Sequence, residues 1–127
     1  MEKVYQSVGA DGLHIPVALM RQYGLEPGAI ATLELQSEWI RIEPARAEPA
    51  TIENRALRYL LTHVGDAATV SVHPLPGGMG WQVDVYGTGM VWPVGKLVYS
   101  PTGVLLADQS TPPDGIRRSL DNGSSQL

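Results

Sequence analysis

The stretch that decides the fold is Gly12-Leu13-His14-Ile15-Pro16-Val17-Ala18-Leu19-Met20-Arg21-Gln22-Tyr23-Gly24-Leu25-Glu26-Pro27-Gly28. Pro16 suits the first position of a helix, because the N–H that it lacks is not needed there. Apolar residues then recur at helical spacing over residues 17–23, and Gly24 is a typical left-handed helix stop. Glu26-Pro27-Gly28 places Pro and Gly in the positions of a type II turn. The stretch therefore predicts one short helix, closed by a turn.

Strands are expected on both sides of this helix. Residues 3–8 alternate between two faces, as a strand does, and residues 13–15 read as a second short strand. After the turn, residues 29–35 and 39–43 alternate in the same way, and residues 36–38 join them as a tight hairpin. Residues 3–44 are therefore expected to form a strand-rich arm with a single helix.

An arm of about 42 residues buries too little apolar surface to fold alone without disulfides, a metal or a partner. The chain has no Cys, so disulfides and Cys-based zinc sites are excluded. Exchange of hairpins between two copies would let each chain complete the other's sheet and remove its exposed edges. The alternative is that the arm packs on the C-terminal part of its own chain, and the spacing of residues is compatible with both.

The run from Gly12 to Gly28, followed by the two hairpin strands up to Pro44, resembles the AbrB/MazE/SpoVT family over about a third of the chain. The shared pattern is Ile-Pro, a short helix with Leu three residues after the Pro, then Gly-Leu-x-Pro-Gly and a β-hairpin. This resemblance implies a swapped-hairpin β-barrel formed by a homodimer, and the chain is expected to associate with itself as a homodimer or a higher even oligomer. It further implies a transcription regulator or the DNA-binding half of an antitoxin. The residues expected in the dimer core are Val4, Leu13, Ile15, Leu19, Leu33, Ile40 and Ile42.

The resemblance also implies that basic side chains of the arm contact DNA. Lys3 in the first strand and Arg21 late in the helix are the candidates, with His14 as a third. Other places that are basic in the family hold different residues here, namely Tyr5, Gln6, Gly12 or Leu13, and Met20.

The charge of the arm bears on this expectation. Residues 1–45 hold three basic and six acidic side chains, a net charge of −3, in a chain whose net charge is −4. Neutralisation of phosphates by Lys and Arg supplies most of the non-specific affinity for DNA. Two alternatives to an AbrB-like DNA-binding regulator therefore stay open. One is a dimerisation or interaction protein that keeps the fold without binding DNA, and the other is an antitoxin-like protein that binds a partner.

The remainder of the chain predicts a small α+β module. A helix is expected over residues 52–64 with Thr51 as its cap, followed by strands at 68–75, 81–86, 96–99 and 104–108. The resulting division is an arm at 1–45, a linker at 46–50, the module at 51–110 and a flexible tail at 111–127. The module is weakly similar to PepSY-like domains, which implies a binding or oligomerisation role with a protein or small-molecule partner. Trp81, Tyr86 and Trp92 are expected in its core, and the alternative is that they line a ligand or partner surface.

The expected fold class is mainly β with two short helices, hence α+β. The three histidines are scattered and Ser71 and His73 share only one face of a strand, so neither a metal site nor a catalytic set is indicated. We therefore expect a non-enzyme without a cofactor. Because no apolar run approaches the roughly 20 residues of a membrane span and the N-terminus lacks a signal-peptide pattern, a soluble, cytoplasmic protein is expected.

Overall fold

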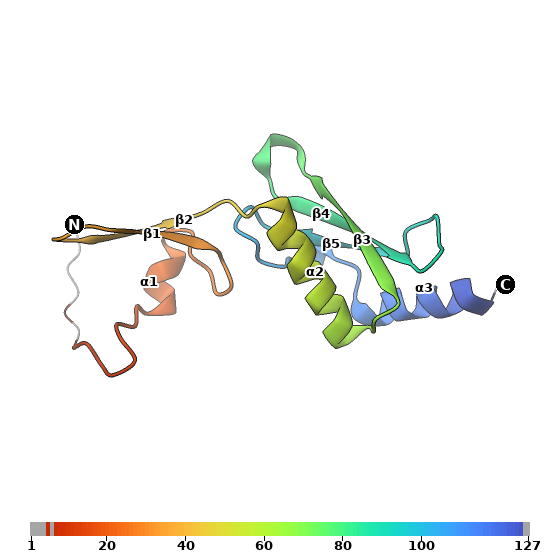
Figure 1. Cartoon of the computed structure of the whole chain (residues 1–127), viewed down its shortest axis with the longest axis horizontal. Coiled ribbons are helices and arrows are strands. Elements are labelled where there is room, and N and C mark those ends of the chain that lie inside the picture. The colour runs from red at the N-terminus through yellow and green to blue at the C-terminus, as the bar shows by residue number, and fades with distance from the viewer. Residues whose placement is uncertain (1–4, 6, 126–127) are drawn as a thin grey trace.

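Helix α1 and strands β1 and β2 form one end of the molecule, and a helix-on-sheet module forms the other (Figure 1). The computed structural model describes residue 5 and residues 7–125. This part of the chain is α+β, with three α-helices and two small antiparallel sheets, so the coarse fold class is confirmed. One helix more than expected is present, and within the described residues of this single chain neither sheet closes into a barrel. None of these helices has the length and apolarity that a membrane span needs.

The helix and hairpin of the arm form much as the sequence predicts. Helix α1 spans Val17–Arg21, with Pro16 as its N-cap rather than its first residue, and Gly24 ends it at a φ of 77°. The Ala29 amide donates to the Glu26 carbonyl at 2.9 Å, which closes the expected turn through Pro27 and Gly28. Strand β1 (Ala31–Leu35) and strand β2 (Ile40–Pro44) then pair antiparallel, with Leu35 opposite Ile40.

The two strands expected before α1 are not formed. The backbone has no regular secondary structure at Tyr5, Ser7 and Val8 or at residues 13–15. Between these two segments, Gly9 and Gly12 form an isolated antiparallel bridge. The strand prediction for these residues is therefore wrong for the isolated chain. The physical reason is that a strand needs a neighbour for its backbone groups, and the chain's own hairpin does not pair with this segment. Lys3, Val4 and Gln6 lie outside the described residues.

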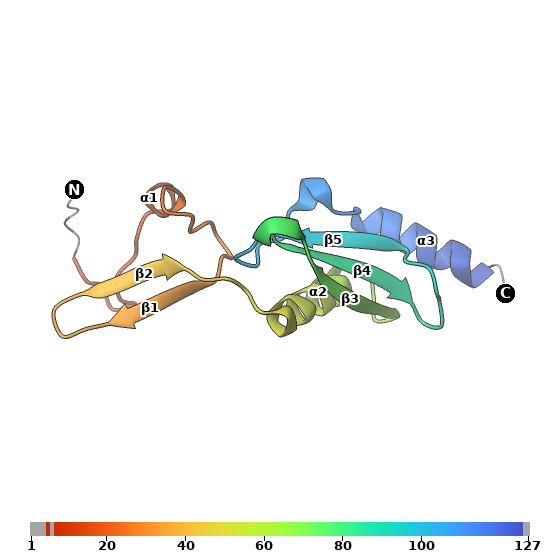
Figure 2. The same ribbon diagram turned by 90° about the horizontal axis from the view of Figure 1, so that it is seen from above.

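The C-terminal module places one helix on a three-stranded sheet (Figure 2). Helix α2 spans Pro49–His63, so the prediction of Thr51 as its cap is wrong, because Pro49 already occupies the first turn. Strands β3 (Ala68–Pro74), β4 (Trp81–Gly87) and β5 (Gly95–Tyr99) pair antiparallel in the order β3-β4-β5. A short 3-10 turn at Pro76–Gly78 joins β3 to β4. The buried residues from both layers include Ile52, Ala56, Leu60, Val83, Val85 and Leu97.

The segment after β5 differs from the expectation. Leu105 makes an isolated bridge to Tyr99 and a 3-10 turn follows at Ala107–Gln109, so the strand predicted over 104–108 is wrong. Helix α3 spans Pro113–Ser125, where a flexible tail was expected. Its Ile116 is fully buried in the core of the module. The Pro, Gly and Ser content favours a loop in isolation, and burial of Ile116 outweighs that local preference.

Tyr99 gives the module a sensitivity to high pH. Burial, and to a smaller extent the neighbouring Tyr59, raise the pKa of its hydroxyl from 10.0 to about 12, although Arg55 opposes this shift. The folded state thus keeps its proton at a pH where the unfolded chain loses it, so stability is unaffected below pH 10 and falls between pH 10 and about 12. We expect a loss of about 2–3 kcal/mol over this range, which Tyr99→Phe removes. Urea unfolding at several pH values measures this, and an equally steep loss in Tyr99→Phe would contradict it.

Candidate functional site

The hairpin of the arm carries an uncovered apolar face. Leu33 lies opposite Ile42, and Leu35 lies opposite Ile40, so all four side chains share one face. Leu33, Leu35 and Ile40 are 59%, 70% and 61% exposed. On the opposite face Arg41 makes ion pairs of 3.7 Å with Glu34 and with Glu43. The hairpin is thus amphipathic, with its apolar side open to solvent.

An apolar groove lies between this face and α1. It has a volume of about 270 Å³ and is lined by Ile15, Leu19, Met20, Tyr23, Leu25 and Ile42. Three residues predicted for a dimer core, Ile15, Leu19 and Ile42, therefore meet at one place. Leu13, Leu33 and Ile40 are exposed beyond it, and Val4 lies outside the described residues.

The arm meets the C-terminal module at a junction that sequence reasoning missed. One terminal nitrogen of Arg55 in α2 donates to the carbonyls of Gly28 at 2.7 Å and Gly103 at 2.8 Å. The amides of Ile30 and Ala47 donate to the carbonyls of Thr102 and Pro101, both at 2.8 Å. This junction fixes the base of the hairpin and leaves its apolar face uncovered. Arg55 gives no signal in the sequence, because both carbonyls reach it only through the fold.

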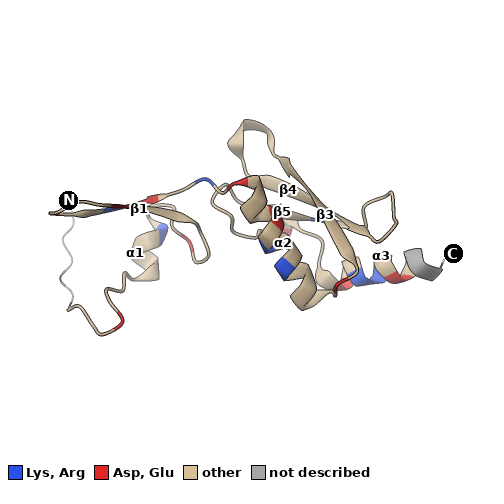
Figure 3. Ribbon diagram, in the orientation of Figure 1, with Lys and Arg blue, Asp and Glu red and all other residues tan. Residues whose placement is uncertain are grey.

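The residues predicted to contact DNA are only partly placed by the structure. His14 and Arg21 are exposed, and within the described part of the chain neither side chain makes a hydrogen bond or ion pair, whereas Lys3 is not described. Figure 3 shows the basic residues spread along the molecule rather than gathered on one element. Arg46, just after β2, lies over the ring of Trp81 at 5.0 Å. Within the described arm, Arg41 is engaged by Glu34 and Glu43, whereas the side chain of Arg21 is not engaged by a carboxylate.

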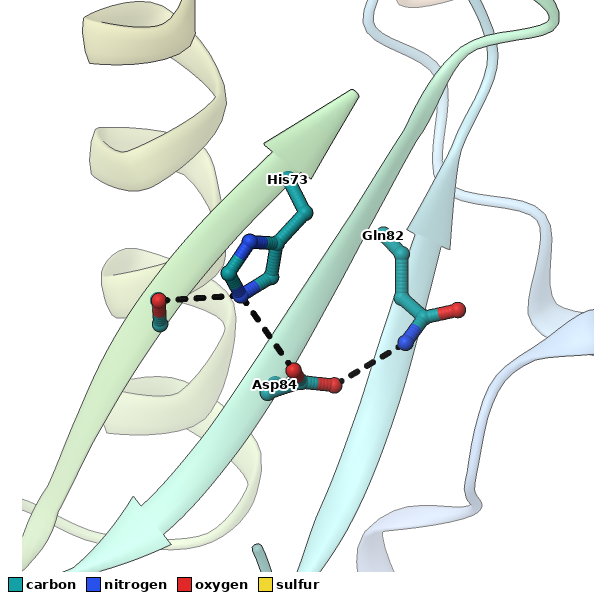
Figure 4. A network of polar contacts seen from close by, with 4 residues as sticks. His73, Gln82 and Asp84 are labelled. Carbon is teal, nitrogen blue, oxygen red and sulfur yellow. Dashed lines mark hydrogen bonds and ion pairs between the residues drawn. The ribbon is translucent and has the colours of Figure 1, made fainter. Parts of the chain in front are cut away.

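A polar cluster lies on the sheet face away from α2 (Figure 4). His73 Nε2 is 3.0 Å from Ser71 Oγ and 3.3 Å from Asp84 Oδ2, and Gln82 donates to Asp84 Oδ1 at 3.0 Å. A catalytic triad needs the acid on one ring nitrogen and the nucleophile on the other. Here Ser71 and Asp84 share Nε2, so this arrangement cannot pass a proton from Ser71 to His73 while Asp84 orients the ring.

A second cavity, of about 470 Å³, lies at the end of the module where α2, the β4–β5 connection and α3 meet. The cavity is lined by the apolar side chains of Val64, Met90 and Leu120 and by the charged residues Asp66, Arg117 and Asp121.

Trp92 is 80% exposed, so the expectation that it is a core residue is wrong, whereas Trp81 is buried as expected. Trp92 belongs to the connection between β4 and β5, which places it outside the packed layers.

Comparison with known proteins adds no relative. No family model matches the chain, and neither the curated proteins nor the solved structures give a significant match.

Proposed function

We propose that this protein is an AbrB-like transcription regulator that acts as a homodimer and binds DNA through its N-terminal arm. The observation that carries the proposal is the uncovered apolar face of the hairpin together with the adjoining groove. A monomer rarely exposes a contiguous apolar surface of this kind, and such surfaces typically mark an interface. The pattern from Gly12 to Gly28 favours a second copy as the occupant, with hairpins exchanged into one barrel.

In the proposed dimer, DNA contact comes from Arg21, His14 and Lys3 of each chain. The side chains of Arg21 and His14 are exposed and make no ion pair with a described residue, so no ion pair has to break before a phosphate binds. Two-fold symmetry would present each cation twice, which matches the symmetry of a palindromic DNA site.

Fluorescence anisotropy with mixed-sequence DNA over a salt series tests this function. We expect binding that weakens steeply as salt increases, and an Arg21→Ala variant with lower affinity and a salt slope reduced by about one for each phosphate that is no longer neutralised. Arg58→Ala is the matched control, because Arg58 is an exposed arginine of α2 outside the arm. Absence of binding at low salt, or an equal decrease in affinity in both variants, would refute DNA binding by the arm.

The second candidate is an interaction protein that uses the same dimer as a platform without binding DNA, or pairs with another protein as antitoxins do. The acidic net charge of the arm favours this second candidate. Residues 1–45 have a net charge of −3, and Arg41 is engaged by Glu34 and Glu43. A dimer by light scattering combined with no DNA binding at low salt would favour this candidate.

A further inference from the structure

The two edges of the β3-β4-β5 sheet differ in whether their outward backbone groups have hydrogen-bond partners. At the β5 edge, Thr111 Oγ1 accepts from the Lys96 amide at 3.0 Å and Ser110 Oγ accepts from the Val98 amide at 2.9 Å. The Thr111 amide also donates to the Lys96 carbonyl at 2.8 Å. The backbone groups of this edge are therefore occupied, in the way that folded proteins commonly protect an edge strand.

The β3 edge lacks such protection. Leu75 and Thr88 donate to Gly80 and Ala67, and since an antiparallel ladder alternates, the amides of Ala68, Val70 and Val72 point away from β4. No described residue accepts a hydrogen bond from these three amides. Figure 2 shows β3 at the margin of the sheet away from β5 and α3. The strand reads Ala-Thr-Val-Ser-Val-His-Pro, with no Lys, Arg, Asp or Glu and with its Pro only at the end.

Helix α2 carries two exposed apolar side chains, Leu57 and Leu61, on the side away from its contacts with β5. Arg55 donates a hydrogen bond to the Gly103 carbonyl, which follows β5, and Tyr59 contributes to the raised pKa of Tyr99 in β5. Arg55 and Tyr59 therefore lie on the side of α2 that faces β5. Leu57 and Leu61 lie about half a turn around the helix from them, hence on the β3 side. Leu61 is 63% exposed, and α2 packs mainly on β3.

We propose that the outer edge of β3 pairs antiparallel with β3 of a second copy, and that Leu57 and Leu61 of the two α2 helices cover the joint. A two-fold axis at Val70 places Ala68 opposite the second copy's Val72, so the three outward amides of each chain all find carbonyl acceptors. On the polar face the same register sets Thr69 opposite Ser71, a favourable hydroxyl pair.

A second copy fits this surface because the outer edge of β3 offers both the amides and the carbonyls that an antiparallel copy of the same strand needs. The register that satisfies the amides brings no Lys, Arg, Asp or Glu of β3 against its own copy, since β3 has none, and His73 lies beside Asp84 of its own chain. The contact is separate from the arm, which the junction at Arg55 holds at the other end of the module. With both contacts formed, the chain has two distinct two-fold interfaces and assembles beyond a dimer.

The test combines variants of the two surfaces in the full chain, with mass measured by light scattering over a concentration series. In a background of Leu33→Glu with Ile40→Glu, which removes arm pairing, we expect the mass to approach twice the 13.7 kDa of one chain as concentration rises. Adding Thr69→Lys and Leu61→Lys should raise the dissociation constant about tenfold or more, because like charges then meet at the joint. Val91→Lys is the matched control, since Val91 is exposed in the β4–β5 connection.

Amide hydrogen exchange supplies the second measurement. Ala68, Val70 and Val72 should become protected as concentration rises, and Thr69→Lys with Leu61→Lys should abolish this while protection in β4 persists. The proposal would be overturned if the Leu33→Glu, Ile40→Glu variant stayed monomeric at every concentration. It would also be overturned if the amides of β3 stayed unprotected in the wild type. An unchanged mass in the Leu33→Glu, Ile40→Glu variant would instead count against arm pairing, and the edge variants would still test the β3 contact by hydrogen exchange.

Discussion

Replacing Leu33 and Ile40 together by Glu is expected to abolish pairing through the arm. Both side chains belong to the exposed apolar face of the hairpin, and in the proposed dimer they become buried. Burial of an unpaired carboxylate costs several kcal/mol, so we expect dimer affinity through this surface to fall by about a thousandfold or more. Sedimentation equilibrium measures the change as a shift of mass toward a smaller species.

Thr32→Glu is the control for this experiment. Thr32 precedes Leu33 in β1 and points to the opposite, charged face of the hairpin, so it introduces the same carboxylate without entering the apolar surface. Near wild-type association is expected for it. Equal association of Thr32→Glu and Leu33→Glu with Ile40→Glu would show that the apolar face does not pair.

The second large effect is expected at Ile116, the buried anchor of α3. Its side chain is fully buried in the core cluster of the module. Truncation to Ala removes apolar packing and leaves a cavity, so Ile116→Ala should lower the free energy of unfolding by about 2–5 kcal/mol. Urea unfolding followed by Trp fluorescence measures this change.

Arg118→Ala tests whether that destabilisation comes from burial rather than from helix formation alone. Arg118 is exposed on the same helix, and its replacement should alter stability by no more than about 0.5 kcal/mol. A similar small effect for Ile116→Ala would mean that α3 does not contribute to the core, and residues 111–127 would then behave as the flexible tail that their composition suggests.

Local signals in the sequence are sufficient where an element depends on near neighbours. Gly24, which ends α1, and Pro27-Gly28, which form the turn, need φ values and hydrogen bonds set within a few residues, so they are predictable. The hairpin of β1 and β2 and the three strands of the module also follow from alternation and turns. By contrast, residues 3–8 and 13–15 have strand-like patterns, but those of them that the structure describes lack a neighbour in the single chain.

The candidate sites divide in the same way. Alternation alone places Leu33 and Ile42 on one face of the hairpin. Helical spacing alone predicts that Leu19 lies on the apolar face of α1, where it lines the groove. The polar cluster at His73 is not predictable as a unit, because the antiparallel register brings Asp84 opposite Ser71 across two strands. The open β3 edge is equally hidden, since only the sheet order distinguishes it from the covered edge at β5.

By itself the sequence determined the amphipathic hairpin, the short helix before it and the alternation of the module strands, because periodicity and turn chemistry are local properties. The tertiary structure decided that α3 forms, since Ile116 is stabilised only once the core exists to bury it. It also decided that Arg55 ties the arm to the module and that the apolar face of the hairpin stays uncovered. These outcomes depend on contacts between residues far apart in the chain, and such contacts leave no periodic trace in the sequence.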